Sequence, residues 1–112
     1  MRPHSENELP KTEVIHVRQM RLGDIYIGRS CYSYRDSGWG NPFKIGPGQN
    51  REQAIAQYRQ WIVRQPQLMA RLKELKGKRL ACWCKPDACH GDVLVELVEE
   101  LYPAPIYHSY LP

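Results

Sequence analysis

No stretch of the sequence approaches the roughly 18 consecutive apolar residues that a membrane-spanning helix needs. The first ten residues, MRPHSENELP, are polar and lack the apolar run of a secretory signal peptide. The chain also lacks internal repeats and low-complexity tracts. We therefore expect a cytoplasmic protein with no membrane partner, in a compartment that keeps thiols reduced.

The composition is that of an ordinary globular protein with a modest excess of positive charge. The 112 residues suffice for one small domain and leave no room for a separate catalytic domain. The formal net charge of +4 suits an anionic partner such as a nucleotide or a nucleic acid. A basic solvated surface would produce the same excess, so both interpretations remain open.

The first half of the chain predicts two strands and a long loop. Residues 1–12 are polar with two prolines, so we expect a flexible lead-in. Segments 14–18 and 25–29 are rich in Val and Ile and predict strands that can pair as a hairpin. Residues 30–50 are rich in Gly, Ser, Asn and Pro. A loop of that length is typically functional or disordered, and its aromatic residues argue against disorder.

The second half predicts a further strand and three helices. Asn50 and Gln53 have the spacing of a capping box at a helix start. The predicted elements are helices at 51–64, 66–76 and 88–101 and a strand at 79–84. We expect a small single α/β domain over residues 13–102, with a mixed sheet of three or four strands covered by about three helices, followed by a tail at 103–112.

The densest chemistry lies where the last strand turns into the last helix. On a strand, Cys82 and Cys84 project to one side and Trp83 to the other. Cys89 and His90 follow a tight proline turn, at the start of a helix. The spacing predicts that these side chains form one site.

One interpretation of this site is a zinc centre. Thiolate and imidazole are the donor types of four-coordinate zinc sites, and Cys82, Cys84, Cys89 and His90 supply four. Against this, the spacing differs from the usual paired knuckles, and two adjacent residues have difficulty reaching one metal. Cys82 and Cys84 can instead be buried small hydrophobes.

A second interpretation makes Cys89 a nucleophile. A thiol at a helix N-terminus has a lowered pKa, and His90 can lower it further. Asp92 would then supply acid or base chemistry, or simply cap the helix. Backbone N–H groups up to Gly91 would face an anion. A third interpretation is a redox-sensing thiol at Cys89.

Polar residues elsewhere can complete a substrate site. The polar face of the strand at 14–18 would border the turn, and an arginine at the end of the strand at 25–29 would join it to bind phosphate. The same pattern is also explained by a sheet face that is simply exposed to solvent. An aromatic side chain of the 38–43 loop would stack on a base. We assign substrate contacts to His16, Arg18, Arg29, Trp39, Asn41 and Gly91.

Five segments together resemble a known family. They are HVR at 16–18, IYIGR at 25–29, GWGNPF at 38–43, YRQW at 58–61 and LACWCKPDACHGDVL at 80–94. This pattern resembles domain of unknown function 4326, common in phages and bacteria. The resemblance implies that the motif residues belong to one composite site, but no activity. A looser similarity to domain of unknown function 488, where the position of Cys84 is usually glutamate, implies a ligand or acid–base role there.

The leading hypothesis is a small enzyme acting on a nucleotide, nucleoside or nucleic-acid base. Cys89, His90 and Asp92 would carry the chemistry, with zinc as a possible cofactor. The alternative is a non-catalytic nucleic-acid- or protein-binding module with a structural zinc. Neither hypothesis specifies an oligomeric state.

Overall fold

The computed structural model describes residues 10–103. Most of the predicted lead-in and tail, residues 1–9 and 104–112, therefore lies outside the described residues. Thr12, at the end of the predicted lead-in, is buried, and its Oγ1 atom accepts a 2.7 Å hydrogen bond from the backbone N–H of Gly77. The domain thus begins at or before Thr12.

The sheet has three parallel strands in the order β1-β3-β2. Their bounds are β1 Glu13–His16, β2 Ile25–Tyr26 and β3 Arg79–Cys82. The predicted α/β class is confirmed, but the sheet is wholly parallel where a mixed sheet was expected. The predicted hairpin is wrong, because β3 pairs with both other strands and separates them.

The central position of β3 follows from its sequence. Leu80, Ala81 and Cys82 are all buried, so the strand is covered on both faces. A short continuous apolar run of this kind is typical of an inner strand in a parallel sheet.

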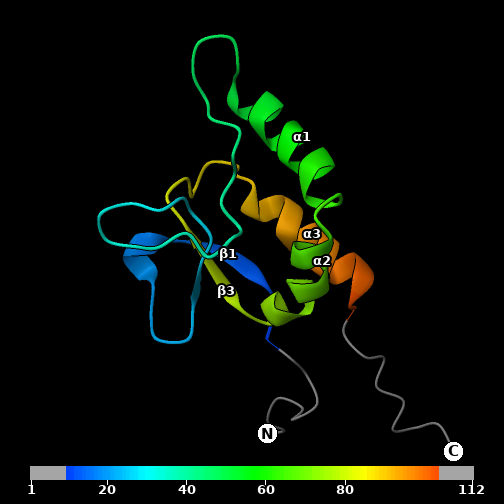
Figure 1. Ribbon diagram of the computed structural model, residues 1–112. Coiled ribbons are helices and arrows are strands. Elements are labelled where there is room, and N and C mark those ends of the chain that lie inside the picture. The colour runs from blue at the N-terminus through cyan, green and yellow to red at the C-terminus, as the bar shows by residue number, and fades with distance from the viewer. Residues whose placement is uncertain (1–9, 104–112) are drawn as a thin grey trace, which may run out of the picture.

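The helices gather on one side of the sheet, as Figure 1 shows. They are α1 Arg51–Ile62, α2 Pro66–Arg71 and α3 Gly91–Leu101, with a 3-10 turn η2 Leu72–Leu75 after α2. The second predicted helix is therefore an α-helix followed by a 3-10 turn. None of the helices within residues 10–103 is long and apolar enough to cross a membrane.

The main core lies between the helices and this face of the sheet. Many of its fully buried members come from α1, η2, α3 and β3; they include Tyr58, Ile62, Leu72, Leu75, Leu80, Val93, Leu94 and Val98. Helix α2 contributes only the partly buried Leu68 and Met69. Helix α3 contacts β1, η2 and α1, and so lies at the centre of the layer. Its N-terminus is thereby fixed beside the end of β3.

The opposite face of the sheet carries a smaller apolar cluster. Ile15, Val17, Tyr26 and Ala81 are buried there. The segment between β2 and α1 helps to cover it, because Tyr34 stacks on Tyr26 with ring centroids 4.7 Å apart. The long loop is therefore part of the packed domain.

Candidate metal centre and adjoining cleft

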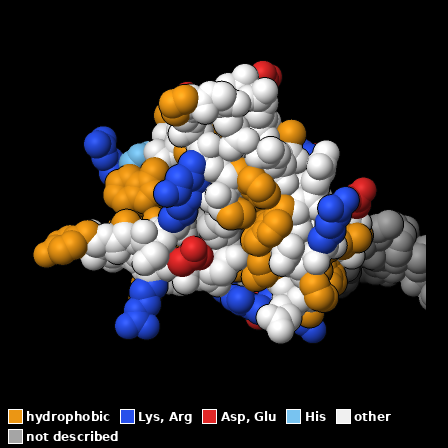
Figure 2. Space-filling model, turned by 45° about the horizontal axis from the view of Figure 1, so that its top comes forward, with side chains coloured by type: hydrophobic (Ala, Val, Ile, Leu, Met, Phe, Trp, Pro, Cys, Tyr) orange, Lys and Arg blue, Asp and Glu red, His pale blue; other side chains and the backbone are white. Residues whose placement is uncertain are grey.

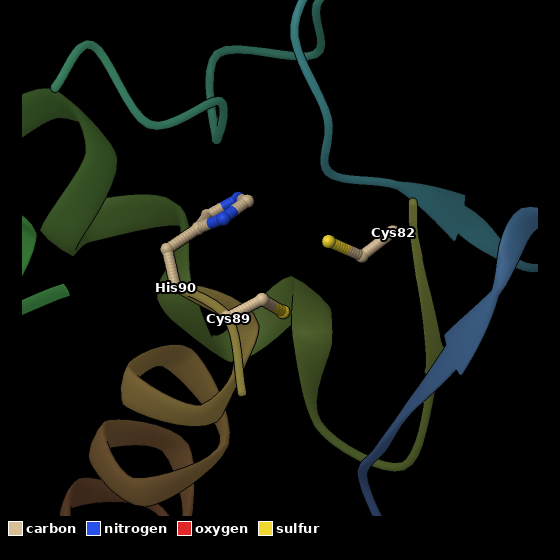
Figure 3. A group of neighbouring side chains, drawn as sticks. All are labelled: Cys82, Cys89 and His90. Atoms are coloured by element: carbon tan, nitrogen blue, oxygen red, sulfur yellow. The ribbon is translucent and has the colours of Figure 1, made fainter. Parts of the chain in front are cut away.

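Two cysteines and a histidine converge where β3 turns into α3. The Sγ atoms of Cys82 and Cys89 and one ring nitrogen of His90 all lie within 4.8 Å of one another. Figure 3 shows the three side chains pointing into the same space, one from the end of β3 and two from the residues before α3. All three residues are buried. The structure therefore contains a Cys/His cluster, to which the adjacent residues Cys89 and His90 both contribute.

The turn between the two halves of the site is tight. The backbone N–H of Asp87 donates a 2.8 Å hydrogen bond to the carbonyl oxygen of Cys84, and the Lys85–Pro86 peptide bond is cis. This turn returns the chain at once from β3 to the start of α3. Cys82 consequently faces Cys89 and His90, which follow it by only a few positions in the sequence.

One hydrogen bond determines which nitrogen of His90 carries a proton. The Nε2 atom lies 2.7 Å from the backbone oxygen of Ile27. A carbonyl oxygen only accepts, so Nε2 is the donor and Nδ1 retains its lone pair in the neutral ring. Burial lowers the pKa of His90, which favours that neutral form. Metal-binding histidines typically make such a bond to a backbone carbonyl.

Cys84 lies beside the cluster, on the same cleft, but is not one of the three close donors. Hydrogen bonds from the thiols of Cys82 and Cys89, together with the Arg51 guanidinium, lower the pKa of Cys84 to about 2. Negative charge in the thiol cluster therefore concentrates on Cys84, which lies near the positive charge of Arg51.

The predicted lowering of the Cys89 pKa is wrong. Its hydrogen bonds with Cys82 and Cys84, together with burial, raise the pKa of Cys89. The N–H of Gly91 donates to Cys89 Sγ over 3.2 Å and opposes this shift without reversing it. The side chain is also buried, with 3 % exposure. Both properties are unlike those of reactive or redox-sensing thiols.

Gly91 and Asp92 shape the start of α3. A Cβ atom on Gly91 would lie 2.7 Å from Ile27 Cδ1 and 2.9 Å from Val14 Cγ2, so glycine allows the helix to approach the sheet. Asp92 accepts a 3.2 Å hydrogen bond from the backbone N–H of Cys89 through Oδ2. This bond ties Asp92, in the first turn of α3, to the residue before the N-cap His90, and the helix has no side-chain cap of the predicted kind.

A cleft of about 530 Å³ opens over the Cys/His cluster. Cys82, Cys84, Cys89 and His90 all line it. Its volume is within the range of pockets that hold small molecules. The cluster therefore faces a space large enough for a ligand.

The walls of the cleft are basic and aromatic. Arg29, Lys44 and Arg51 line it, and none of the described lining residues is Asp or Glu. Tyr26, Phe43 and Trp83 add aromatic rings. On the surface shown in Figure 2, hydrophobic side chains likewise gather with Lys and Arg on both sides of them. The lining therefore suits an anionic ligand with a flat ring.

Arg29 and Asn41 lie on the cleft and shape its wall. Arg29 donates from Nε to the oxygen of Asn41 over 2.7 Å and from Nη2 to that of Phe43 over 3.3 Å. The Asn41 side chain accepts from the N–H of Phe43 and donates to the oxygen of Ala54. Arg29 therefore holds the loop to the residues after β2, and Asn41 holds it to α1.

Four other predicted substrate residues do not lie on the cleft. One is Gly91, which is buried and whose N–H donates to Cys89 Sγ and so does not face an anion. His16 and Arg18 line a separate depression. Trp39 is buried, with 1 % exposure, and Arg71 covers its ring at 5.3 Å, so it cannot stack on a base. The loop folds this side chain into the core because Tyr58 Oη donates to the Trp39 oxygen over 2.8 Å.

Sequence reasoning missed three residues of the cleft: Lys44, Arg51 and Trp83. Trp83 was placed only on the far side of the strand, whereas its exposed ring also reaches the cleft. Arg51 directly follows the helix cap Asn50. Its position at the start of a helix was the one sequence feature that could have indicated a role in the cleft. Its Nη1 atom donates to the Ala88 oxygen over 3.0 Å and so joins α1 to the turn before α3.

The fold and the site define a small α/β domain with a Cys/His cluster at a strand–helix junction. The chain belongs to the family described as Domain of unknown function (DUF4326), whose model matches residues 12–100. It is 36% identical over 73 residues to an uncharacterized 12.4 kDa protein in the nrdA-td intergenic region of Enterobacteria phage T4. That match covers 62% of this chain and 67% of the phage protein. No solved structure matches the chain. The predicted resemblance to this family is confirmed.

Proposed function

We propose that this protein binds zinc at the Cys/His cluster and holds a phosphate-bearing nucleotide in the adjoining cleft. One observation carries the proposal: three close donor atoms form the floor of a cleft whose charged lining residues are all cationic. Zinc would supply a positive centre beneath the ligand, and the lining would supply phosphate and ring contacts.

The donor set fits zinc. Thiolates and a neutral imidazole are its usual protein ligands, and the hydrogen bond of His90 to Ile27 presents a free ring nitrogen. Cys82, Cys89 and His90 form a set of three. Three protein ligands leave one position for water or substrate, which is the arrangement of catalytic zinc.

Cys84 supports a second candidate function. It lines the same cleft as Cys82 and Cys89, and both of these thiols lower its pKa, so it lies beside the donor group and would be the fourth ligand of a closed site. Four protein ligands are typical of a structural zinc. The protein would then be a binding module for nucleic acid or protein, with no chemistry at the metal.

The nucleotide part of the proposal rests on the cleft lining. One arginine guanidinium can bind two phosphate oxygens at once. Arg29, which follows β2, and Arg51, at the start of α1, both line the cleft, where Arg51 also pairs with Asp87 at 3.7 Å. The exposed ring of Trp83 offers a surface for a base. With catalytic zinc, the metal would activate water toward the bound substrate, in a hydrolytic reaction.

The metal site is tested by zinc analysis of the reconstituted full chain and of serine variants. We expect about one zinc per chain in the wild type and a loss of most zinc in Cys89→Ser. Cys31→Ser is the matched control, because Cys31 lines the same cleft but is not in the donor group. A wild-type chain that takes up no zinc would exclude the site.

Cys84→Ser separates the two candidate functions. Retention of zinc with unchanged stoichiometry favours the open, catalytic site, and loss of zinc favours the closed, structural one.

Ligand binding is tested by calorimetry of the zinc-loaded protein with purine and pyrimidine mononucleotides. We expect binding that Lys44→Ala weakens, while Lys78→Ala, an exposed residue away from the cleft, leaves it unchanged. Absence of binding to every mononucleotide would contradict the nucleotide part and leave the metal part to its own test.

A further inference from the structure

A second basic depression lies on the other side of the chain segment that follows β3. His16, Arg18 and Lys85 line it together with Gln19 and Pro86. None of these described lining residues is acidic. Arg18 and Lys85 are exposed, and neither makes an ion pair with another residue of the range 10–103. The depression is therefore a second place where an anion would be favoured.

Trp83 lies between the depression and the cleft. It lines the cleft, and its ring meets the edge of His16, a residue of the depression, with centroids 6.1 Å apart. Its side chain is 52% exposed although it is well anchored. The indole N–H donates to Tyr26 Oη over 2.9 Å, and Tyr34 packs against the ring at 6.3 Å.

An exposed aromatic ring that is held in place is ready to stack on a base without losing much conformational freedom. Basic surfaces on both sides of such a ring are the arrangement by which proteins hold single-stranded nucleic acid: cations follow the backbone and aromatic rings stack on bases. A free mononucleotide would fill the cleft alone and leave the depression without a role.

We propose that the cleft takes one nucleotide unit of a single-stranded nucleic acid, whose base stacks on Trp83 and whose neighbouring phosphate lies at Arg18 and Lys85. This inference rests on the proposed function, because it extends the ligand of the same cleft. A short single strand will therefore bind more tightly than its mononucleotide, and with a steeper dependence on salt.

The test measures binding of the zinc-loaded full chain to a labelled single-stranded hexanucleotide, as DNA and as RNA, at several salt concentrations. We expect Arg18→Ala/Lys85→Ala to weaken binding about tenfold and to reduce the salt slope by about 1.4, the value for two phosphate contacts. The matched control, Arg64→Ala/Lys73→Ala, removes the same charge from exposed positions outside both surfaces and should change neither value.

Trp83 is tested separately by Trp83→Phe, which keeps a ring, and Trp83→Ala, which removes it. We expect the alanine variant to lose about fivefold or more in affinity for the hexanucleotide and the phenylalanine variant to lose less. A difference between DNA and RNA would identify the sugar that the site prefers.

Two results would overturn the inference. In the first, the mononucleotide binds and the hexanucleotide binds no more tightly. This outcome leaves the proposed function intact. The other is an equal loss of affinity for the hexanucleotide in both double variants. Binding of a polyglutamate peptide as tight as that of the hexanucleotide would count in the same way, since either result would show that net charge alone causes the binding. If neither mononucleotide nor strand binds, the nucleotide part of the proposed function fails together with the inference.

Discussion

The Nε2 atom of His90 donates a 2.7 Å hydrogen bond to the backbone oxygen of Ile27, the residue that follows β2. Both residues are buried. The bond joins the start of α3 to the sheet and also fixes the imidazole that faces the cysteines. One contact therefore serves both the stability of the fold and the chemistry of the candidate metal centre.

Replacement of His90 separates these two effects. In the metal-free protein, His90→Ala leaves the buried Ile27 oxygen without a donor, so we expect it to lower the free energy of unfolding by about 1–3 kcal/mol. His90→Gln retains an N–H donor and should cost less. Urea unfolding with chelator and with added zinc measures both. Zinc that stabilises His90→Ala as much as the wild type would show that His90 is not a ligand.

Gly91→Ala tests the close approach of α3 to the sheet. Alanine is the better helix former by about 1 kcal/mol, but overpacking against buried Ile27 and Val14 costs about 1–3 kcal/mol. We therefore expect a net loss of up to about 2 kcal/mol in denaturant unfolding. Gly46→Ala is the control, because its added Cβ meets nothing within 4 Å. Equal effects at the two positions would contradict the packing argument.

Arg51 is expected to matter for ligand binding more than for folding. Its guanidinium lines the cleft and lies near Cys84, so Arg51→Ala should weaken mononucleotide binding by about tenfold, a loss near 1.4 kcal/mol. Arg51→Lys retains the charge but lacks the paired N–H donors, so its affinity should lie between those of the wild type and Arg51→Ala. Arg59→Ala on the same helix, which pairs with Glu96 outside the cleft, is the control for calorimetry. Equal binding by all three variants would remove Arg51 from the site.

Asn50→Ala should destabilise the start of α1. Its side chain accepts from the N–H of Gln53 over 2.8 Å, and the Gln53 side chain bonds back to the N–H of Asn50. Loss of such a cap costs about 1 kcal/mol. Gln57→Ala, at an exposed position inside the helix, should change the unfolding midpoint little. A cap variant as stable as this control would show that packing alone holds α1.

The local signals in the sequence predicted the helices well. The capping box at Asn50 and the first-turn position of Pro66 both occur as expected. Strand pairing was harder, because the alternation of Ile25 and Ile27 identifies a buried face but not the neighbouring strand. The 3-10 turn Val17–Gln19 begins the connection between β1 and β2, which lie on either side of β3. The turn has no distinctive sequence signal.

The candidate site was predicted in part for a similar reason. Cys82 lies on a predicted strand, and Cys89 and His90 lie at the predicted start of a helix a few residues later. Because the two elements are close in sequence, the convergence of the three side chains could be anticipated. The cleft walls come from distant segments. Whether Trp39 or Trp83 is exposed depends on how the long loop packs, and residue type alone cannot tell the two apart.

The strand order has a consequence for the folding of the chain. Within residues 10–103, each outer strand pairs with β3 alone, and β3 is the last of the three strands along the chain. A fragment that stops before Arg79 contains β1 and β2 but has no strand to pair with either of them. The sheet consequently forms by long-range closure, once the segment that contains β3 has been synthesised.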